Sequence, residues 1–214
     1  LAPFSALTEA QLDRVIAIYE EALAAPWEWP PALLRGLAEE RRETRWALAA
    51  LQEGDPAGFI VVEYLSGVRV WYIRYFAVRA DLRGQGWGSA ILTGVLDVID
   101  GADAPEAAAG RRGVMLEAEA LEQGLPDAER AVRTRRQAFY RRHGALVTGA
   151  RAPRPPDAPA AMPEYDLLFI PSRTWQGRLD GALRRDLARA LAVEGYGVPE
   201  DAAWLQVQLA RYEG

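Results

Sequence analysis

A glycine-rich segment carries the clearest chemical signal in the sequence. It reads Arg83-Gly84-Gln85-Gly86-Trp87-Gly88-Ser89. The segment follows a run of β-branched and aromatic residues and precedes apolar residues at helical spacing. Backbone N–H groups in the first turn of a helix have no intrahelical partner and lie at the positive end of the helix dipole. Because glycines would let an anion approach these groups closely, the segment predicts a phosphate site built without lysine.

Three kinds of phosphate site could use such a turn, and a helix cap without a ligand is the fourth alternative. A P-loop requires a lysine, but all 25 basic residues of the chain are arginines. A dinucleotide fingerprint requires its third glycine one residue later, and the short turns before the segment argue against a parallel βαβ unit. The remaining pattern is R-x-x-G-x-G, which Arg83, Gly86 and Gly88 match.

Composition excludes several other chemistries. The chain of 214 residues has no cysteine and one histidine, which excludes disulfides, thiolate nucleophiles and cysteine- or histidine-rich metal sites. The absence of lysine excludes Schiff-base catalysis. A formal net charge of −5 argues against nucleic-acid binding. The apolar runs are strand-sized and no leader segment is evident, so we expect a cytoplasmic protein that neither spans nor binds a membrane.

The hydrophobic pattern predicts an α/β (α+β) fold with a mixed, largely antiparallel sheet flanked by helices. The predicted helices cover 9–24, 31–41, 91–99 and 127–142, and the predicted strands cover 45–51, 57–64, 69–78, 114–119, 145–149 and 165–170. Two further helices are predicted at the C-terminus. We therefore predict one domain over 1–173 and a two-helix extension over 174–214.

The predicted extension carries leucines four residues apart, at positions 179, 183, 187 and 191. Such a stripe must be buried, either on its own domain or against a second copy. We expect a homodimer as the more favoured of these two arrangements.

Several segments together resemble the Gcn5-related N-acetyltransferase (GNAT) superfamily over about residues 8–170. The Arg83–Gly88 pattern resembles the pyrophosphate motif of that family. Leu116-Glu117-Ala118 resembles its L-E-V strand, and the segment from Phe139 to Gly144 resembles its F/L-Y-x-x-x-G motif. Arg133 and Arg136 depart from the Asn and Ala of many members, and the segment 119–130 is longer than in compact members. These departures leave the far end of the cofactor and the acceptor pocket open.

The resemblance implies a GNAT-like fold and acetyl-CoA as the cofactor. It further implies direct acetyl transfer to a primary amine within a ternary complex, and the chain has no cysteine for an acyl-enzyme. The acceptor would be a small-molecule or peptide amine. The residues that the resemblance assigns to the cofactor are Phe76, Ala77, Val78, Arg83, Gly84, Gln85, Gly86, Trp87, Gly88 and Ser89.

The resemblance also implies the catalytic residues. Tyr140 would be the general acid for the leaving thiolate, since a phenol with a pKa near 10 is protonated at neutral pH. Glu117 would be the general base for the amine, and Glu119 is the substitute because it shares the same strand face. The alternatives are a tyrosine packed at a helix end and a solvent-exposed strand carboxylate.

Acceptor-side residues are expected on two further segments. On the predicted strand 69–78, Tyr72 could orient the acceptor, and Arg74 could bind a carboxylate or phosphate of the acceptor unless it pairs with Glu63. Trp27 and Trp29 lie between the first two helices, where they could shape an apolar pocket or anchor the loop. The arginines between 130 and 142 could meet the 3′-phosphate of coenzyme A or form a solvated helix face.

Two other functions stay open at this point. A non-catalytic acyl-CoA-binding or regulatory protein on the same fold would keep the glycine turn without turnover. An interaction module would use its C-terminal helices to bind a partner protein.

Overall fold

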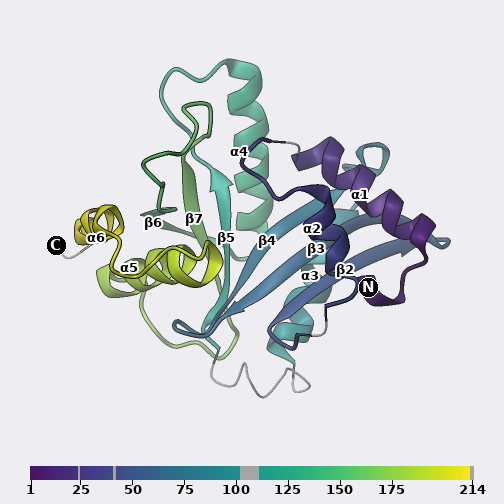
Figure 1. Ribbon diagram of the computed structural model, residues 1–214, viewed down its shortest axis with the longest axis horizontal. Helices are drawn as coiled ribbons and strands as arrows, with labels where there is room; N and C mark the ends of the chain where they lie inside the picture. Colours follow the sequence, from purple (N-terminus) through teal and green to yellow (C-terminus); the bar gives the residue numbers. More distant parts are fainter. Residues whose placement is uncertain (24, 41, 102–110, 213–214) are drawn as a thin grey trace. The chain divides into compact units, whose positions relative to one another are not determined.

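The computed structural model describes residues 1–23, 25–40, 42–101 and 111–212. Within these residues the chain forms two compact units, whose elements Figure 1 shows as ribbons. The first unit contains residues 1–63 and 73–101, and the second contains residues 64–72 and 111–212. Residues 102–110, between the predicted helix 91–99 and the predicted strand 114–119, lie outside the described residues.

The first unit begins with short N-terminal elements and ends with a long helix. Its strands are β1 (Ala2–Pro3), β2 (Arg45–Gln52), β3 (Asp55–Leu65) and β4 (Val70–Val78), of which β3 and β4 also give residues to the second unit. Its helices are α1 (Glu9–Leu23), α2 (Pro31–Gly36) and α3 (Trp87–Asp100), with 3-10 turns at Phe4–Ala6 and Ala80–Leu82.

The second unit contains the remaining strands and the C-terminal helices. Its strands are β5 (Gly113–Glu119), β6 (Leu146–Arg151) and β7 (Tyr165–Pro171). Its helices are α4 (Asp127–Arg142), α5 (Gly181–Ala190) and α6 (Ala203–Leu209), with a π-helical turn η4 (Leu191–Gly195) after α5 and a 3-10 turn η5 (Ala210–Tyr212) at the end. In Figure 1, α5 runs across the strands of this unit.

The strand order is β1-β2-β3-β4-β5-β7-β6. Antiparallel pairs join β1 to β2, β2 to β3, β5 to β7 and β7 to β6. The register sets Arg45 opposite Glu63 and Glu117 opposite Leu167. The observed architecture is a mixed α/β fold with a largely antiparallel seven-stranded sheet, and it confirms the predicted fold class.

The start of α1 follows from a capping box. The Thr8 backbone N–H donates to Gln11 Oε1 at 2.8 Å, and the Gln11 N–H donates to Thr8 Oγ1 at 3.3 Å. These reciprocal bonds satisfy two backbone donors that a helix start leaves without partners. The predicted start of the helix is therefore confirmed by its hydrogen bonds.

Two N-terminal features differ from the sequence prediction. Helix α2 ends at Gly36 instead of near residue 41, and three bonds of the i→i+3 type continue the chain to Glu39. Glycine is a poor helix former, so the helix tightens into turns at this position. The two-residue strand β1 was missed because two residues carry no periodic signal.

Aromatic side chains build the core of the first unit. The ring centroids of Tyr19 and Tyr75 lie 5.1 Å apart, and those of Trp29 and Tyr75 lie 5.6 Å apart. The Tyr19 hydroxyl donates to the Trp29 carbonyl oxygen at 2.6 Å, and the Trp29 N–H donates to the Tyr75 hydroxyl oxygen at 3.1 Å. Burial raises the pKa of Tyr75 far above its usual value. The loop between α1 and α2 is thus held on its own unit at Trp29.

The C-terminal leucine stripe is buried within the second unit. Leu183, Leu187 and Leu191 are at most 5% exposed and belong to one cluster with Tyr72 and Met115. Since this packing buries the stripe inside the chain, it removes the reason for which the sequence favoured a homodimer. The homodimer and the domain boundary at 173 stay predictions.

Two absences hold for the described part of the chain. None of its helices combines the length and the apolar character that a membrane span requires. No group of three or more His, Cys, Asp or Glu side chains in these residues is arranged to hold a metal ion.

Candidate functional site

The glycine turn leads directly into α3 and leaves the start of that helix uncapped. Gly86 is the N-cap residue with φ 91°, and no side chain caps the helix there. Gly84 also has a positive φ, 79°, and a Cβ atom at either glycine would meet no atom within 4 Å. L-residues with a side chain rarely adopt this backbone conformation. The start of α3 thus has no side-chain cap, and open space lies where the Cβ atoms of Gly84 and Gly86 would be.

Side-chain hydrogen bonds of Arg83 and Gln85 stabilise the glycine turn. Arg83 Nε donates to the Val78 carbonyl oxygen at 3.0 Å, and Arg83 Nη2 lies 3.2 Å from Glu21 Oε1. Gln85 Nε2 donates to the Asp81 carbonyl oxygen at 2.7 Å. Ser89 is exposed in the first turn of the helix. These bonds tie the turn to the end of β4 before any ligand is present.

The end of β4 lies close to β3 because of Gly58, a residue that the sequence analysis did not identify. A Cβ atom at Gly58 would lie 2.6 Å from the Ala77 carbonyl oxygen and 2.9 Å from Ile91 Cδ1. Ala77 is buried, while Phe76 and Val78 are partly exposed. Gly58 therefore permits the close approach that fixes the strand end preceding the glycine turn.

In the second unit, two tyrosines bind the carboxylate of Glu117. The Tyr72 hydroxyl donates to Glu117 Oε2 at 2.5 Å, and the Tyr196 hydroxyl donates to Glu117 Oε1. Tyr72 was predicted as an acceptor-side residue, and in the structure its hydroxyl binds Glu117, the predicted base. Tyr196 was missed, since no local pattern links the C-terminal region to β5.

The substitute base Glu119 has a different environment. Its carboxylate is ion-paired with Arg136 of α4. Gln137 Nε2 donates to the Glu119 carbonyl oxygen and to Asp166 Oδ2, both at 3.1 Å. The carboxylate of Glu119 is thus ion-paired with an arginine, and that of Glu117 accepts hydrogen bonds from two phenol hydroxyl groups.

Tyr140 is a buried phenol at the end of α4. It is 7% exposed, and burial raises its pKa to about 12. Its backbone carbonyl oxygen accepts from His143 N at 3.0 Å and from Ala145 N at 3.1 Å. Its hydroxyl forms no hydrogen bond with any residue that the structure describes. Since buried tyrosine hydroxyls usually have a partner, this group has an unused donor.

Three of the arginines on α4 are engaged by their own unit. Arg133 is buried, where Nη1 donates to the Ala120 carbonyl oxygen at 2.8 Å, and it is also ion-paired with Glu129. Arg136 pairs with Glu119, and Arg130 Nη2 donates to a backbone carbonyl at 3.1 Å. The other arginines of this segment, Arg135, Arg141 and Arg142, are exposed.

Arg74 and Trp29, two of the predicted acceptor-side residues, belong to one cluster with Glu63 and Arg45. Arg74 Nη2 lies 2.7 Å from Glu63 Oε2, and Arg45 Nε lies 2.6 Å from Glu63 Oε1. The Arg74 guanidinium is also stacked 4.6 Å from the centre of the Trp29 ring. The ion pair with Glu63, one of the two alternatives for Arg74, is therefore the one observed. The indole N–H of Trp27 is buried without a partner in the described residues.

Glu63→Gln is expected to lower the free energy of unfolding by about 3 kcal/mol, because breaking a buried ion pair leaves an uncompensated charge. Glu63 is 7% exposed and Arg74 is 8% exposed, so solvent cannot replace the lost carboxylate. Urea unfolding measures the loss. Glu9→Gln is the control, since the Glu9 side chain is 89% exposed and solvent screens its pair with Arg35, so the loss should be much smaller. Equal effects of the two variants would contradict this account.

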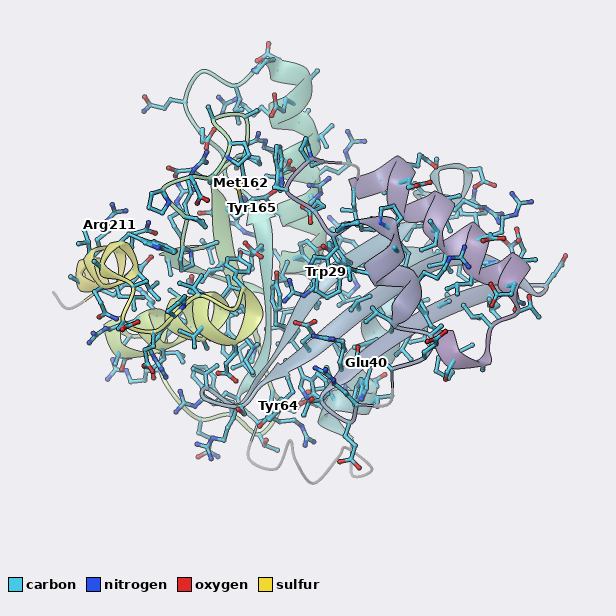
Figure 2. All side chains as sticks on the ribbon, viewed as in Figure 1. Trp29, Glu40, Tyr64, Met162, Tyr165 and Arg211 are labelled. Carbon is cyan, nitrogen blue, oxygen red and sulfur yellow. The ribbon has the colours of Figure 1, made fainter. Side chains whose placement is uncertain are left out.

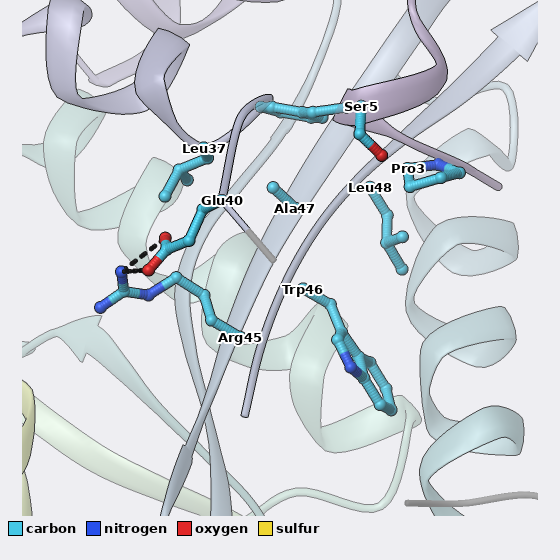
Figure 3. A pocket seen from close by; sticks show the side chains of 9 residues that line it. Pro3, Ser5, Leu37, Glu40, Arg45, Trp46, Ala47 and Leu48 are labelled. Carbon is cyan, nitrogen blue, oxygen red and sulfur yellow. Dashed lines mark hydrogen bonds and ion pairs between the residues drawn. The ribbon is translucent and has the colours of Figure 1, made fainter. Parts of the chain in front are cut away.

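Two hollows lie on the first unit, and neither includes the glycine turn. The smaller one, about 110 Å³, is lined by Pro3, Ser5, Leu37, Glu40, Arg45 and their neighbours (Figure 3). Its volume is below the roughly 300–1,000 Å³ that small-molecule binding sites usually have. The larger one, about 520 Å³, lies along α2 and is lined by Trp29, Leu33, Glu40 and neighbours; Figure 2 labels Trp29 and Glu40. Of the predicted site residues, Trp29 lines the larger of these two hollows.

Comparison with known proteins finds one family model that matches part of the chain. Residues 12–112 match the model of the acetyltransferase (GNAT) family. The match covers just under half of the chain, and it confirms the resemblance stated from the sequence. No curated protein sequence matches the chain.

Solved structures of low sequence identity share the fold. A GNAT-family protein from Bacteroides thetaiotaomicron has a TM-score of 0.59 and 20% identity, over 86% of this chain and 91% of its own. The NAA60 protein of Arabidopsis thaliana, in complex with acetyl-CoA, has a TM-score of 0.57 and 14% identity, over 77% and 95%. An aminoglycoside 6′-N-acetyltransferase complexed with coenzyme A has a TM-score of 0.55 and 16% identity, over 77% and 92%.

Proposed function

We propose that the protein is an N-acetyltransferase that moves an acetyl group from acetyl-CoA to a primary amine by direct transfer in a ternary complex. The observation that carries the proposal is the uncapped start of α3 behind Gly86, within the region that matches the GNAT family. The alternative, a non-catalytic acyl-CoA-binding or regulatory protein on the same fold, would use the same turn without turnover.

The residues of the glycine turn fit the pyrophosphate of coenzyme A. The turn combines two glycines with positive φ, open space in place of their Cβ atoms and an uncapped helix start. Together these features suit a closely bound anion. The first turn of α3 itself carries no acidic side chain that would oppose a phosphate. Two of the solved structures with this fold carry acetyl-CoA or coenzyme A, which supports the same choice of cofactor.

The bound cofactor would supply an activated thioester, and the protein would supply positioning and proton transfer. Holding two reactants in the right orientation can lower a barrier by about 7–11 kcal/mol. Proton transfer by a positioned side chain contributes roughly 10²–10⁴-fold more. We therefore expect binding of both substrates to contribute most of the rate.

We assign the proton for the leaving thiolate to Tyr140. A pKa of about 12 keeps this phenol protonated across the physiological range, and its hydroxyl has no protein partner within the described residues. A hydrogen bond from such a group would stabilise the developing negative charge on sulfur. Because the phenol is a weak acid, its contribution should lie near the lower end of the range for acid–base catalysis.

We assign removal of the amine proton to Glu117, either directly or through water. Its carboxylate accepts hydrogen bonds from the phenols of Tyr72 and Tyr196. Glu119, the substitute, is ion-paired with Arg136, which favours Glu117 for the role.

The acceptor is a primary amine of a small molecule or a peptide. Trp29 lines the larger hollow of the first unit, together with Glu39, Glu40 and Arg45. Glu63 already engages Arg74, which weakens the expectation that this arginine binds an acidic group of the acceptor. Cytoplasmic location and homodimer formation are kept as predictions from the sequence.

Glu117→Gln is expected to lower kcat by about 10²-fold and to leave the affinity for acetyl-CoA within about twofold of the wild type. Glutamine keeps the shape and one of the two acceptor oxygens, replaces the other with an NH2 donor, and cannot take a proton. Glu119→Gln is the matched control and should retain most of the activity. A larger loss in the Glu119 variant would transfer the role of the base to that residue.

A further inference from the structure

The C-terminal segment contains a π-helical turn that ends at a tyrosine. After α5 the chain continues as η4, and the Tyr196 N–H donates to the Leu191 carbonyl oxygen at 2.9 Å, an i→i+5 bond. Turns of this type are rare and often occur at functional sites. The wider turn directs the chain toward Gly197, whose φ is 72°.

The same turn is fixed to the hairpin between β3 and β4 by a carboxylate. Glu194 accepts from the Ser66 N–H at 2.7 Å, from Ser66 Oγ at 3.0 Å and from the Gly67 N–H at 3.0 Å. A Cβ atom at Gly67 would lie 2.7 Å from Glu194 Oε1, so the absence of a side chain there permits this contact. The position of η4 is therefore set two residues before Tyr196.

Tyr196 and Tyr72 each bind one oxygen of the Glu117 carboxylate. Tyr72 is 3% exposed on β4 and belongs to the cluster around the α5 leucines, and Tyr196 packs against that cluster. Both phenols are thus held in place by apolar packing, so the two bonds fix the orientation of the carboxylate. A glutamate side chain without such partners would sample several rotamers.

We propose that Tyr196 is a positioning residue for acetyl transfer, acting through Glu117. This inference rests on the proposed function, in which Glu117 takes the amine proton. The C-terminal extension then has a catalytic purpose besides stability, because it supplies one of the two groups that aim the base. Displacing a positioned group by about 1 Å can cost up to about 10²-fold in rate.

The first part of the test compares Tyr196→Phe with Tyr212→Phe. The Tyr212 hydroxyl lies on the same C-terminal segment, but it binds the Arg151 backbone N–H at 2.9 Å instead of Glu117. Tyr196→Phe is expected to lower kcat about tenfold and to leave KM for acetyl-CoA within about twofold. Tyr212→Phe should leave both constants unchanged. Equal losses of kcat in the two variants would mean that the segment acts only on stability, and this would overturn the inference.

The second part is a double-mutant cycle between positions 196 and 117. If Tyr196 acts through Glu117, then Tyr196→Phe should have no further effect on kcat in the Glu117→Gln background. Multiplicative effects would overturn the inference. Activity is followed by release of the coenzyme A thiol with a thiol reagent, and the chain contributes no cysteine to that signal.

The assay separates the inference from the proposed function. The amine panel consists of an aminoglycoside, 2-phenylethylamine and a peptide with a free N-terminal alanine. A wild-type protein that acetylates none of them overturns the proposed function and the inference with it. An active wild type with multiplicative effects at 196 and 117 overturns the inference alone.

Discussion

Gly86→Glu is expected to abolish the binding of acetyl-CoA, with a loss of affinity of at least about 10²-fold. The variant would put a negative charge beside the N–H groups at the start of α3, where the pyrophosphate is proposed to bind. Because a Cβ atom at residue 86 meets nothing within 4 Å, the new side chain should fit the protein and still oppose the phosphate. Isothermal titration with acetyl-CoA measures the effect.

Two control variants separate the charge at residue 86 from backbone strain. Gly86→Ala imposes the same strain at φ 91° without the charge, so it should weaken binding much less than the glutamate does. Gly54→Glu adds a glutamate at φ 87°, also with no atom within 4 Å, in the turn between β2 and β3. It should bind acetyl-CoA normally. A folded Gly86→Glu protein with unchanged affinity would contradict the phosphate site.

Tyr140→Phe is expected to slow acetyl transfer by about 10²-fold without weakening the binding of acetyl-CoA. The variant removes only the hydroxyl, whose hydrogen bond to the leaving sulfur is proposed to form during the reaction. Since this hydroxyl has no partner in the described residues, its removal should not destabilise the fold. Steady-state kinetics with calorimetric binding separate the two quantities.

The pH dependence gives a further check on Tyr140. Its pKa of about 12 means that the proton is lost only as the pH rises through that value. The wild-type rate should therefore show no loss from this group between about pH 7 and 10.

Tyr64→Phe is the control for the Tyr140→Phe variant, because Tyr64 is a buried tyrosine of the same unit without a proposed role (Figure 2). An unchanged rate in Tyr140→Phe would remove the acid role.

Local signals in the sequence predicted the parts of the structure that depend on short-range contacts. The glycine turn before α3 involves residues a few positions apart, so its spacing alone is informative. The pairing of Arg74 with Glu63 was one of two open alternatives, because strand alternation brings such residues together across a hairpin.

Contacts between distant residues could not be predicted in the same way. Tyr196 and Glu117 are 79 positions apart, and their hydrogen bond depends on the π-helical turn η4, which has no recognised sequence signature. The close approach at Gly58 likewise depends on the packing of β3, β4 and α3. The leucine stripe was identified correctly, but the surface that buries it depends on tertiary packing.

Calorimetric titration of the purified protein with acetyl-CoA, NAD and ATP tests the central claim most directly. We predict that acetyl-CoA binds with a micromolar or lower dissociation constant, and that NAD and ATP do not bind with such affinity. Absence of acetyl-CoA binding would reduce the glycine turn to a helix cap, and it would contradict the proposed function together with the roles assigned to Tyr140, Glu117 and Tyr196.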